Sequence, residues 1–297
     1  MGTSEVNAIE GSADYLVVAV SGALFMLGLF ANAALANRVY LNRAQWQRGI
    51  DKLVWRPWSL SHLSTILALL VLLSVVFGGA TQFLLGLLAG EDKLDQPIQL
   101  VITGLVIQLA TIVLIIGVLV YRRMTWSAAF DHPTHRAPQK LGTSIIYYLA
   151  VMPLVVLCAA ASHAILNGIG VEPETQELFK DISKSMTPGM MVGSFILAAV
   201  GAPITEELLF RGIALPVTAK YIGTFPAVIL VSLVFAIIHM NLASTLPLFV
   251  LAIGMSLAYI YSQSILVPIV MHACFNAINL LMFFLLQQEG LFEALLR

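Results

Sequence analysis

The chain has 297 residues, of which 59% are hydrophobic and 10% are charged, whereas soluble globular proteins have about 45–50% apolar and about 25% charged residues. This composition excludes both a water-soluble globular fold and a disordered chain. The formal net charge is −1, so the chain lacks the cationic excess that binds a nucleic-acid backbone, and no nucleic-acid partner is expected. Cys158 and Cys274 lie in apolar runs without metal-binding spacing and are interpreted as core residues.

Apolar runs of about 20 residues, the length needed to cross a bilayer, follow one another along the chain. The sequence predicts eight membrane-spanning helices, at residues 15–36, 63–88, 98–120, 143–166, 190–217, 225–240, 246–261 and 267–286. The expected fold class is therefore an all-α polytopic membrane protein. We expect two parts: residues 1–142, with three spans and a basic cytoplasmic loop, and residues 143–297, with five spans.

The first span is expected to be retained. The residues before it include Glu5, Glu10 and Asp14 and no Lys or Arg, whereas a signal peptide begins with basic residues and has a shorter apolar stretch.

Basic residues are concentrated in alternate loops. One set of loops holds Arg38, Arg43, Arg48, Lys52, Arg56, Arg122, Arg123, Arg136, Lys140, Arg211 and Lys220. The other set holds Lys93, Lys180, Lys184 and Arg297. Because Lys and Arg in short loops favour the cytoplasmic side of a membrane, both termini are expected outside the cytoplasm. The expected location is the bacterial inner membrane, with the lipid bilayer as a partner.

The fifth span contains three ionisable side chains, Glu206, Glu207 and Arg211. Each charge at the centre of a spanning helix costs about 2.5 to 3.5 kcal/mol. Glu207 and Arg211 are four residues apart and can form a salt bridge on one helix face, but Glu206 points about 100° away from that face. If these residues only fixed helix packing or marked a helix end, one ion pair would be enough. Here the carboxylate of Glu206 remains outside the pair. Pro203 is expected to kink the helix or begin a new one beside the carboxylates.

Three further polar residues lie in the later spans. His239 follows Phe235 by four residues, and His272 precedes Asn276 by four, so each pair shares a helix face. Alone, each histidine is better interpreted as a core residue, but two imidazoles, a carboxamide and a carboxylate in three spans are the components of a hydrolytic site. Glu206 and His239 are predicted at equal depth. His272 reaches that depth only if residues 262–266 enter the protein.

These residues resemble the signature of the CPBP family, which includes the CAAX prenyl endopeptidase (Ras-converting enzyme) and bacterial Abi-type homologues. The family pattern is EExxxR, then FxxxH, then HxxxN. In this sequence it is filled by Glu206, Glu207 and Arg211, then by Phe235 and His239, then by His272 and Asn276. The match covers about a quarter of the chain.

The resemblance implies a catalytic core within residues 143–297 whose helices enclose an intramembrane cavity, and an intramembrane endopeptidase acting on a membrane-anchored or membrane-proximal protein or peptide. It implies that Glu206 activates water with His239, that Glu207 and Arg211 support them, and that His272 and Asn276 donate hydrogen bonds to the oxyanion.

No cofactor is expected. Glu206, His239 and His272 would also make a three-ligand zinc set, which is not favoured because the HExxH spacing is absent. His132 and His135 could pair on a metal, but no third ligand is near them in the sequence. Two alternative functions stay open: a non-proteolytic membrane scaffold or immunity factor, and a proton-coupled transporter, which is weaker because no inverted repeat is visible.

Overall fold

The computed structural model describes residues 3–89, 95–131, 137–171 and 187–287. In these ranges the regular structure is helical, apart from an isolated bridge between Asp131 and Ser264. The predicted all-α fold is therefore confirmed.

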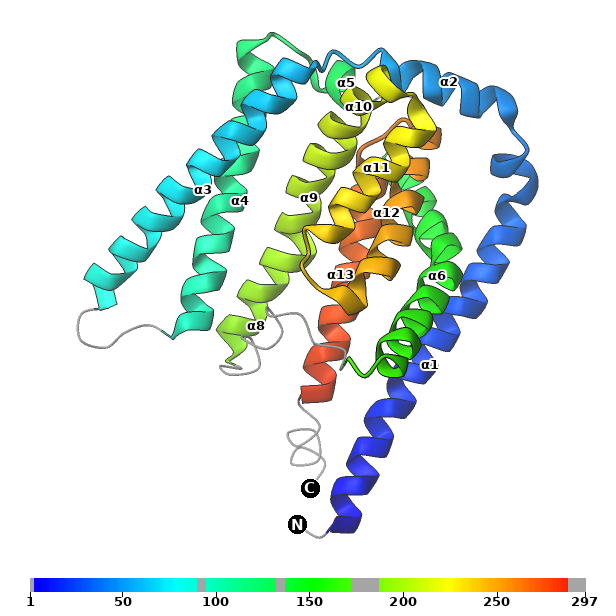
Figure 1. The fold of residues 1–297 in the computed structure, drawn as a ribbon, viewed down its shortest axis with the longest axis vertical. Helices are drawn as coiled ribbons and strands as arrows, with labels where there is room; N and C mark the ends of the chain where they lie inside the picture. The colour runs from blue at the N-terminus through cyan, green and yellow to red at the C-terminus, as the bar shows by residue number, and fades with distance from the viewer. Residues whose placement is uncertain (1–2, 90–94, 132–136, 172–186, 288–297) are drawn as a thin grey trace.

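The helices follow one another in chain order as α1 (Thr3–Leu35), the π-helix η1 (Ala36–Tyr40), α2 (Arg43–Val54), α3 (Leu60–Ala89), α4 (Gln96–Tyr121), α5 (Trp126–Ala129), α6 (Ala137–Gly168), α8 (Pro188–Phe195), the π-helix η2 (Ile196–Gly201), α9 (Ala202–Glu207), the π-helix η3 (Leu208–Ala214), α10 (Leu215–Ile222), α11 (Thr224–Ile237), α12 (Leu242–Ser262) and α13 (Leu266–Gln287). The segments from α8 to α10 form one continuous rod (Figure 1).

Seven described helices are long and apolar enough to cross a membrane, close to the eight predicted. They lie at Val17–Leu35, Leu60–Leu88, Gln96–Tyr121, Gln139–Gly168, Pro188–Ile222, Leu242–Ser262 and Leu266–Leu285. The start of α1 and the end of α13 lie at the same end of the bundle, and α2 lies across the opposite end (Figure 1). The chain is an integral multi-pass membrane protein.

The eighth predicted span, residues 225–240, is the apolar helix α11, which has 14 residues. That length is about 21 Å, less than the roughly 30 Å core of a bilayer. The chain turns at His239 and Met240, where Met240 has a left-handed φ of 50°. Asn241 then caps α12 by accepting a hydrogen bond from the backbone of Ser244. The turn lies at mid-height in the bundle rather than at its end (Figure 1), and the side chain of His239 is 23% exposed.

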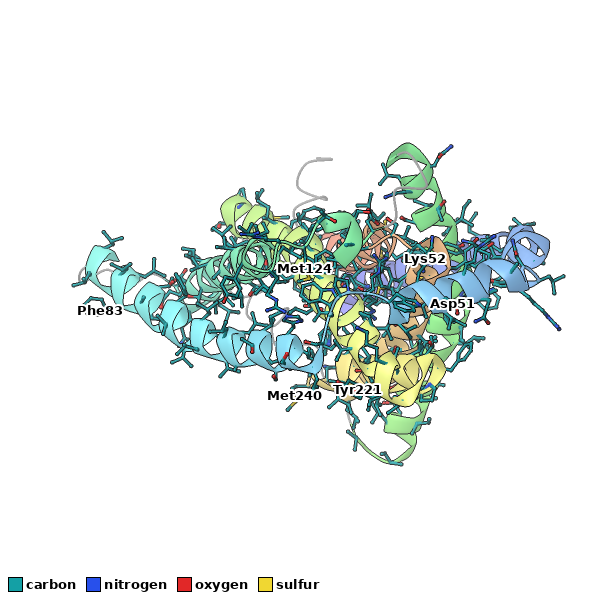
Figure 2. All side chains as sticks on the ribbon, turned by 90° about the horizontal axis from the view of Figure 1, so that it is seen from above. Asp51, Lys52, Phe83, Met124, Tyr221 and Met240 are labelled. Atoms are coloured by element: carbon teal, nitrogen blue, oxygen red, sulfur yellow. The ribbon has the colours of Figure 1, made fainter. Side chains whose placement is uncertain are left out.

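Burial differs widely among the helices. The spans of α1 and α3 are each 6% buried, whereas that of α12 is 56% buried, because α12 packs against α6, α11 and α13. Seen from the α2 end, α3 runs outward from the bundle with Phe83 near its far end, while Asp51 and Lys52 of α2 lie over the bundle (Figure 2). Among the described spanning helices, α12 is therefore the most buried.

The α2 end of the bundle is held by polar side chains that bind backbone carbonyls. Lys220 donates to the carbonyls of Arg56 and Trp58, and Arg56 donates to that of Ser127 at 3.0 Å. The Tyr259 hydroxyl donates to the carbonyl of Phe130 at 3.1 Å. These bonds fix the loops that connect the helices above the candidate site.

Several predictions concern residues outside those the structure describes. These are the metal pairing of His132 and His135 and the loop charges of Lys93, Arg136, Lys180, Lys184 and Arg297. They stay predictions, as does the division of the chain between residues 142 and 143.

Candidate active site

The segment that carries the two glutamates begins in a π-helical register. In η2 the backbone N–H of Ala202 donates to the carbonyl of Leu197, five residues back. The next carbonyl, that of Ala198, would pair in this register with residue 203, but Pro203 has no N–H. Asn276 on α13 replaces the missing donor, with its Nδ2 2.7 Å from the Ala198 oxygen. Pro203 thus stands in the first turn of α9, where the π register of η2 ends, and the rod continues across it without a gap.

Glu207 and Arg211 form the salt bridge that their spacing predicts. Arg211 Nη1 lies 2.8 Å from Glu207 Oε1, and both side chains are fully buried. Arg211 also donates to the carbonyl of Ala252 on α12 at 3.1 Å, and its guanidinium lies 4.5 Å from the centre of the Phe235 ring. A buried charge needs such partners, because a charge left alone in a low dielectric is strongly disfavoured.

His272 completes this buried cluster from α13. Its Nδ1 lies 2.9 Å from the same Glu207 oxygen that Arg211 binds. The connection before α13 enters the protein, as the depth of His272 requires: Gln263, Ser264 and Ile265 are buried. The carboxylate of Asp131 accepts the backbone N–H of Ile265 at 3.1 Å and anchors the connection.

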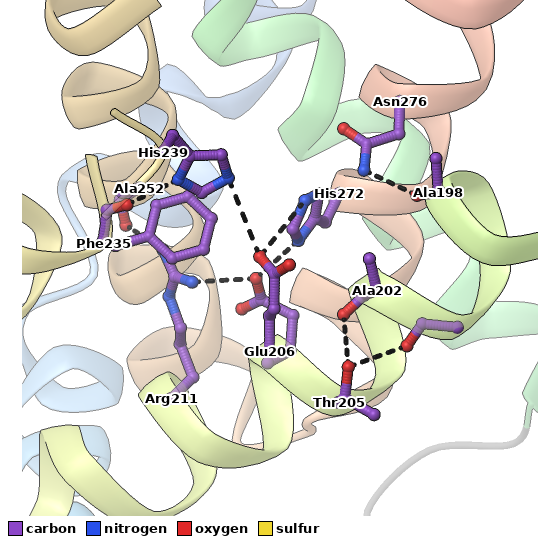
Figure 3. A network of polar contacts seen from close by, with 12 residues as sticks. Ala198, Ala202, Thr205, Glu206, Arg211, Phe235, His239, Ala252, His272 and Asn276 are labelled. Atoms are coloured by element: carbon purple, nitrogen blue, oxygen red, sulfur yellow. Dashed lines mark hydrogen bonds and ion pairs between the residues drawn. The ribbon is translucent and has the colours of Figure 1, made fainter. Parts of the chain in front are cut away.

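Glu206 lies between the two histidines (Figure 3). Its Oε2 is 3.9 Å from His239 Nε2 and 4.0 Å from His272 Nε2. This oxygen is buried and has no direct hydrogen-bond partner. The side chains of Glu206 and His239 are 27% and 23% exposed, whereas that of His272 is 3% exposed. The site therefore opens on the side of Glu206 and His239.

The other ring nitrogen of each histidine determines the tautomer. His239 Nδ1 lies 2.7 Å from the backbone oxygen of Phe235, and a carbonyl oxygen only accepts, so Nδ1 carries the proton. His272 Nδ1 likewise faces the Glu207 carboxylate. In its neutral form each ring therefore presents an unprotonated Nε2 towards Glu206, and in that form the three groups together can accept hydrogen bonds from a small bound molecule.

This donor set has the chemistry of a zinc site, but its spacing is wider than zinc prefers. Tetrahedral zinc with bonds of about 2.0–2.1 Å places its ligand atoms about 3.4 Å apart, whereas Glu206 Oε2 is 3.9 and 4.0 Å from the two nitrogens. In the part of the chain that the structure describes, no group of three His, Cys, Asp or Glu side chains is arranged to hold a metal ion.

Five of the six predicted residues thus meet in one network, and Asn276 lies to one side of it (Figure 3). The contact that the structure gives Asn276 is with the Ala198 carbonyl, not with the carboxylates or imidazoles. Two contributors escaped the sequence reasoning. The Ala252 carbonyl leaves no sequence signal. Gln108 on α4, which donates to the carbonyl of Leu197 at 3.0 Å, could have been noticed as a polar residue in the middle of an apolar span.

Comparisons with known proteins agree with the motifs. Residues 188–278 match the family model described as type II CAAX prenyl endopeptidase Rce1-like. A protein of Bacillus subtilis (strain 168) named putative membrane peptidase YdiL is 26% identical over 147 residues. That alignment covers 48% of this chain and 57% of the relative. No solved structure matches.

The matched residues contain all six candidate site residues and run from the start of α8 into α13. The resemblance predicted from the three motifs is therefore confirmed: residues 188–278 are similar to the Rce1-like, or CPBP, family of membrane peptidases.

Proposed function

We propose that the chain is an intramembrane endopeptidase that hydrolyses a peptide bond in a membrane-anchored or membrane-proximal protein, with water activated by Glu206. The observation that carries the proposal is the position of Glu206 Oε2, 3.9 Å from His239 Nε2 and 4.0 Å from His272 Nε2. These gaps are too long for direct hydrogen bonds, which need about 3.2 Å or less.

The gap between Glu206 and His239 suits a water molecule. An oxygen about 2.8 Å from both atoms would bridge them with an angle of about 90°, within the range that a water accommodates. Glu206 takes one proton of this water as general base, and His239 Nε2 accepts a hydrogen bond from the other. The water oxygen then attacks the carbonyl carbon of the substrate, and the proton held by Glu206 passes to the leaving amine.

The oxyanion of the tetrahedral intermediate needs donors. His272 donates to the oxyanion through Nε2 in the form in which both ring nitrogens carry protons, while its Nδ1 is held 2.9 Å from the Glu207 carboxylate. Asn276 keeps one Nδ2 hydrogen on Ala198 and has a second to offer. A fixed donor of this kind typically contributes about 3 to 4 kcal/mol to the transition state. The scheme uses no cofactor.

The proposed setting is the inner membrane of a bacterium, with the α2 end of the bundle in the cytoplasm and both termini outside it. The support is the exposed basic residues at the α2 end, including Arg43, Arg48 and Arg122, because loop Lys and Arg favour the cytoplasmic side.

The test compares the variants Glu206→Gln and His239→Ala with the wild-type protein, in proteoliposomes that contain candidate membrane-anchored substrates. We expect each variant to lose about 10²- to 10⁴-fold in cleavage rate while its thermal unfolding stays close to that of the unchanged chain. Equal cleavage by all three proteins would contradict the proposal. If the wild-type protein binds a partner without cleaving it, a scaffold or immunity factor is favoured. Chelator-sensitive cleavage that zinc restores would show that a metal is required.

A further inference from the structure

Gln108 is a polar side chain in the middle of the apolar helix α4, and it has no part in the proposed reaction. Its Nε2 donates to the carbonyl of Leu197 in η2 at 3.0 Å. That carbonyl already accepts the N–H of Ala202 in the π register, so the amide is a second donor to it. A carboxamide in a membrane span carries a cost of burial. This bond offsets part of that cost, because Gln108 Oε1 is buried without a hydrogen-bond partner.

The Gln108 carboxamide lies directly against the backbone of Gly201. A Cβ on Gly201 would be 1.8 Å from Gln108 Oε1 and 2.7 Å from its Cδ. No residue with a Cβ allows this approach unless the carboxamide moves away. Gly201 therefore lets a side chain of α4 reach the last turn of η2.

The neighbouring carbonyl is held from a different helix. Asn276 of α13 donates to the Ala198 oxygen at 2.7 Å, and Gln108 of α4 donates to the Leu197 oxygen. Two consecutive carbonyls of one π segment thus each receive a side-chain amide. The amide of Asn276 compensates for the donor that Pro203 lacks. The amide of Gln108 replaces no missing donor, so its effect must lie in holding the segment itself.

The register of η2 determines where Glu206 points. A π turn contains one residue more than an α turn, and successive residues of a helix are rotated by about 100°. Glu206 lies in α9, which begins directly after η2. A return of η2 to the α register would rotate Glu206 away from His239 and His272.

We propose that Gln108 is a positioning residue, which holds η2 in its π register and thereby aims Glu206 at the two histidines. The effect on cleavage rests on the function proposed above. The effect on the backbone does not depend on that function.

The test uses Gln108→Met, which keeps an unbranched side chain of similar length and removes the amide. Amide hydrogen exchange in nanodiscs should become faster in residues 196–207, and kcat should fall by about 10- to 100-fold, as a displacement of about 1 Å in a catalytic group can cause, with KM little changed. Gln82→Leu is the matched control, because Gln82 donates to Thr103 between α3 and α4 at 3.2 Å and not to η2.

Gly201→Ala provides a second route that does not alter Gln108. Its Cβ should displace the carboxamide and reproduce both effects. In the double variant Gln108→Ala with Gly201→Ala, the new Cβ enters the space left by the carboxamide, so the double variant should be no worse than Gln108→Ala alone.

The proposal is overturned if neither Gln108→Met nor Gly201→Ala changes the amide exchange rate of residues 196–207. It is also overturned if exchange becomes faster in these variants while kcat stays normal. If the wild-type protein cleaves none of the substrates, the proposed function fails. The exchange measurement alone then tests whether Gln108 holds η2 in its π register.

Discussion

Helix α3 and the rod from α8 to α10 were predicted from the same apolar pattern, yet they differ in what surrounds them. The span of α3 is 6% buried and its side chains, such as Val75 and Phe83, are mostly exposed to the surroundings. The rod is 33% buried over its span and places Glu207 and Arg211 at zero exposure. A lipid-facing residue needs only to be apolar, whereas an ionisable residue in a span needs partners from other helices.

The adjacent carboxylates of Glu207 and Glu206 also differ in burial and in their partners. Glu207 is fully buried, and one of its oxygens binds both Arg211 and His272. Glu206 is 27% exposed, and its Oε2 has no direct partner. Glu207 is therefore bound within the fold, and Glu206 is the carboxylate to which the proposed function assigns the activation of water.

The largest effect on stability is expected at Glu207. Glu207→Gln leaves the Arg211 guanidinium buried without its counter-charge, which should cost about 3 to 5 kcal/mol in the free energy of unfolding. Denaturant unfolding in detergent measures this value. Glu206→Gln is the matched control and should change it little, because Glu206 is partly exposed.

The double variant Glu207→Met with Arg211→Met sharpens this prediction. It removes both charges together, so its free energy of unfolding should be closer to that of the wild type than that of Glu207→Gln is. Cleavage should be lost, because His272 no longer has a carboxylate beside its Nδ1. A double variant as unstable as Glu207→Gln would show that the pair is not what stabilises this region.

A smaller effect is expected where α2 meets the buried helix α12. A Cβ on Gly49 would be 2.2 Å from the backbone oxygen of Ile260, and that backbone has little freedom to move. Gly49→Ala should therefore destabilise the fold by about 1 to 3 kcal/mol, as overpacking does. Gln47→Ala, on the exposed face of the same helix, should stay within about 0.5 kcal/mol, and equal losses in both would contradict the packing argument.

The smallest effect is expected on the outer face of α3. Val75 is 69% exposed, so Val75→Ala should change the free energy of unfolding by about 0.5 kcal/mol or less. Ile115→Ala on the neighbouring helix α4 removes a fully buried side chain and should cost about 2 to 5 kcal/mol. Thermal unfolding of both variants in one detergent compares them, and a large loss at Val75 would mean that this face is covered by protein.

The sequence alone determined the membrane helices and the pairing of Glu207 with Arg211. Both depend on local rules: a bilayer requires a fixed length of apolar helix, and residues four apart share a helix face. The motif residues could likewise be named, because ionisable groups are conspicuous in apolar spans.

Tertiary structure alone decided how those residues are used. It ended α11 short, so that His239 lies in a turn at mid-height of the bundle, and it directed the amides of Asn276 and Gln108 to the carbonyls of one π segment. No local pattern encodes these outcomes. Which carbonyl lacks a donor depends on the helical register, and which side chain supplies that donor depends on helices far apart in the sequence that pack side by side.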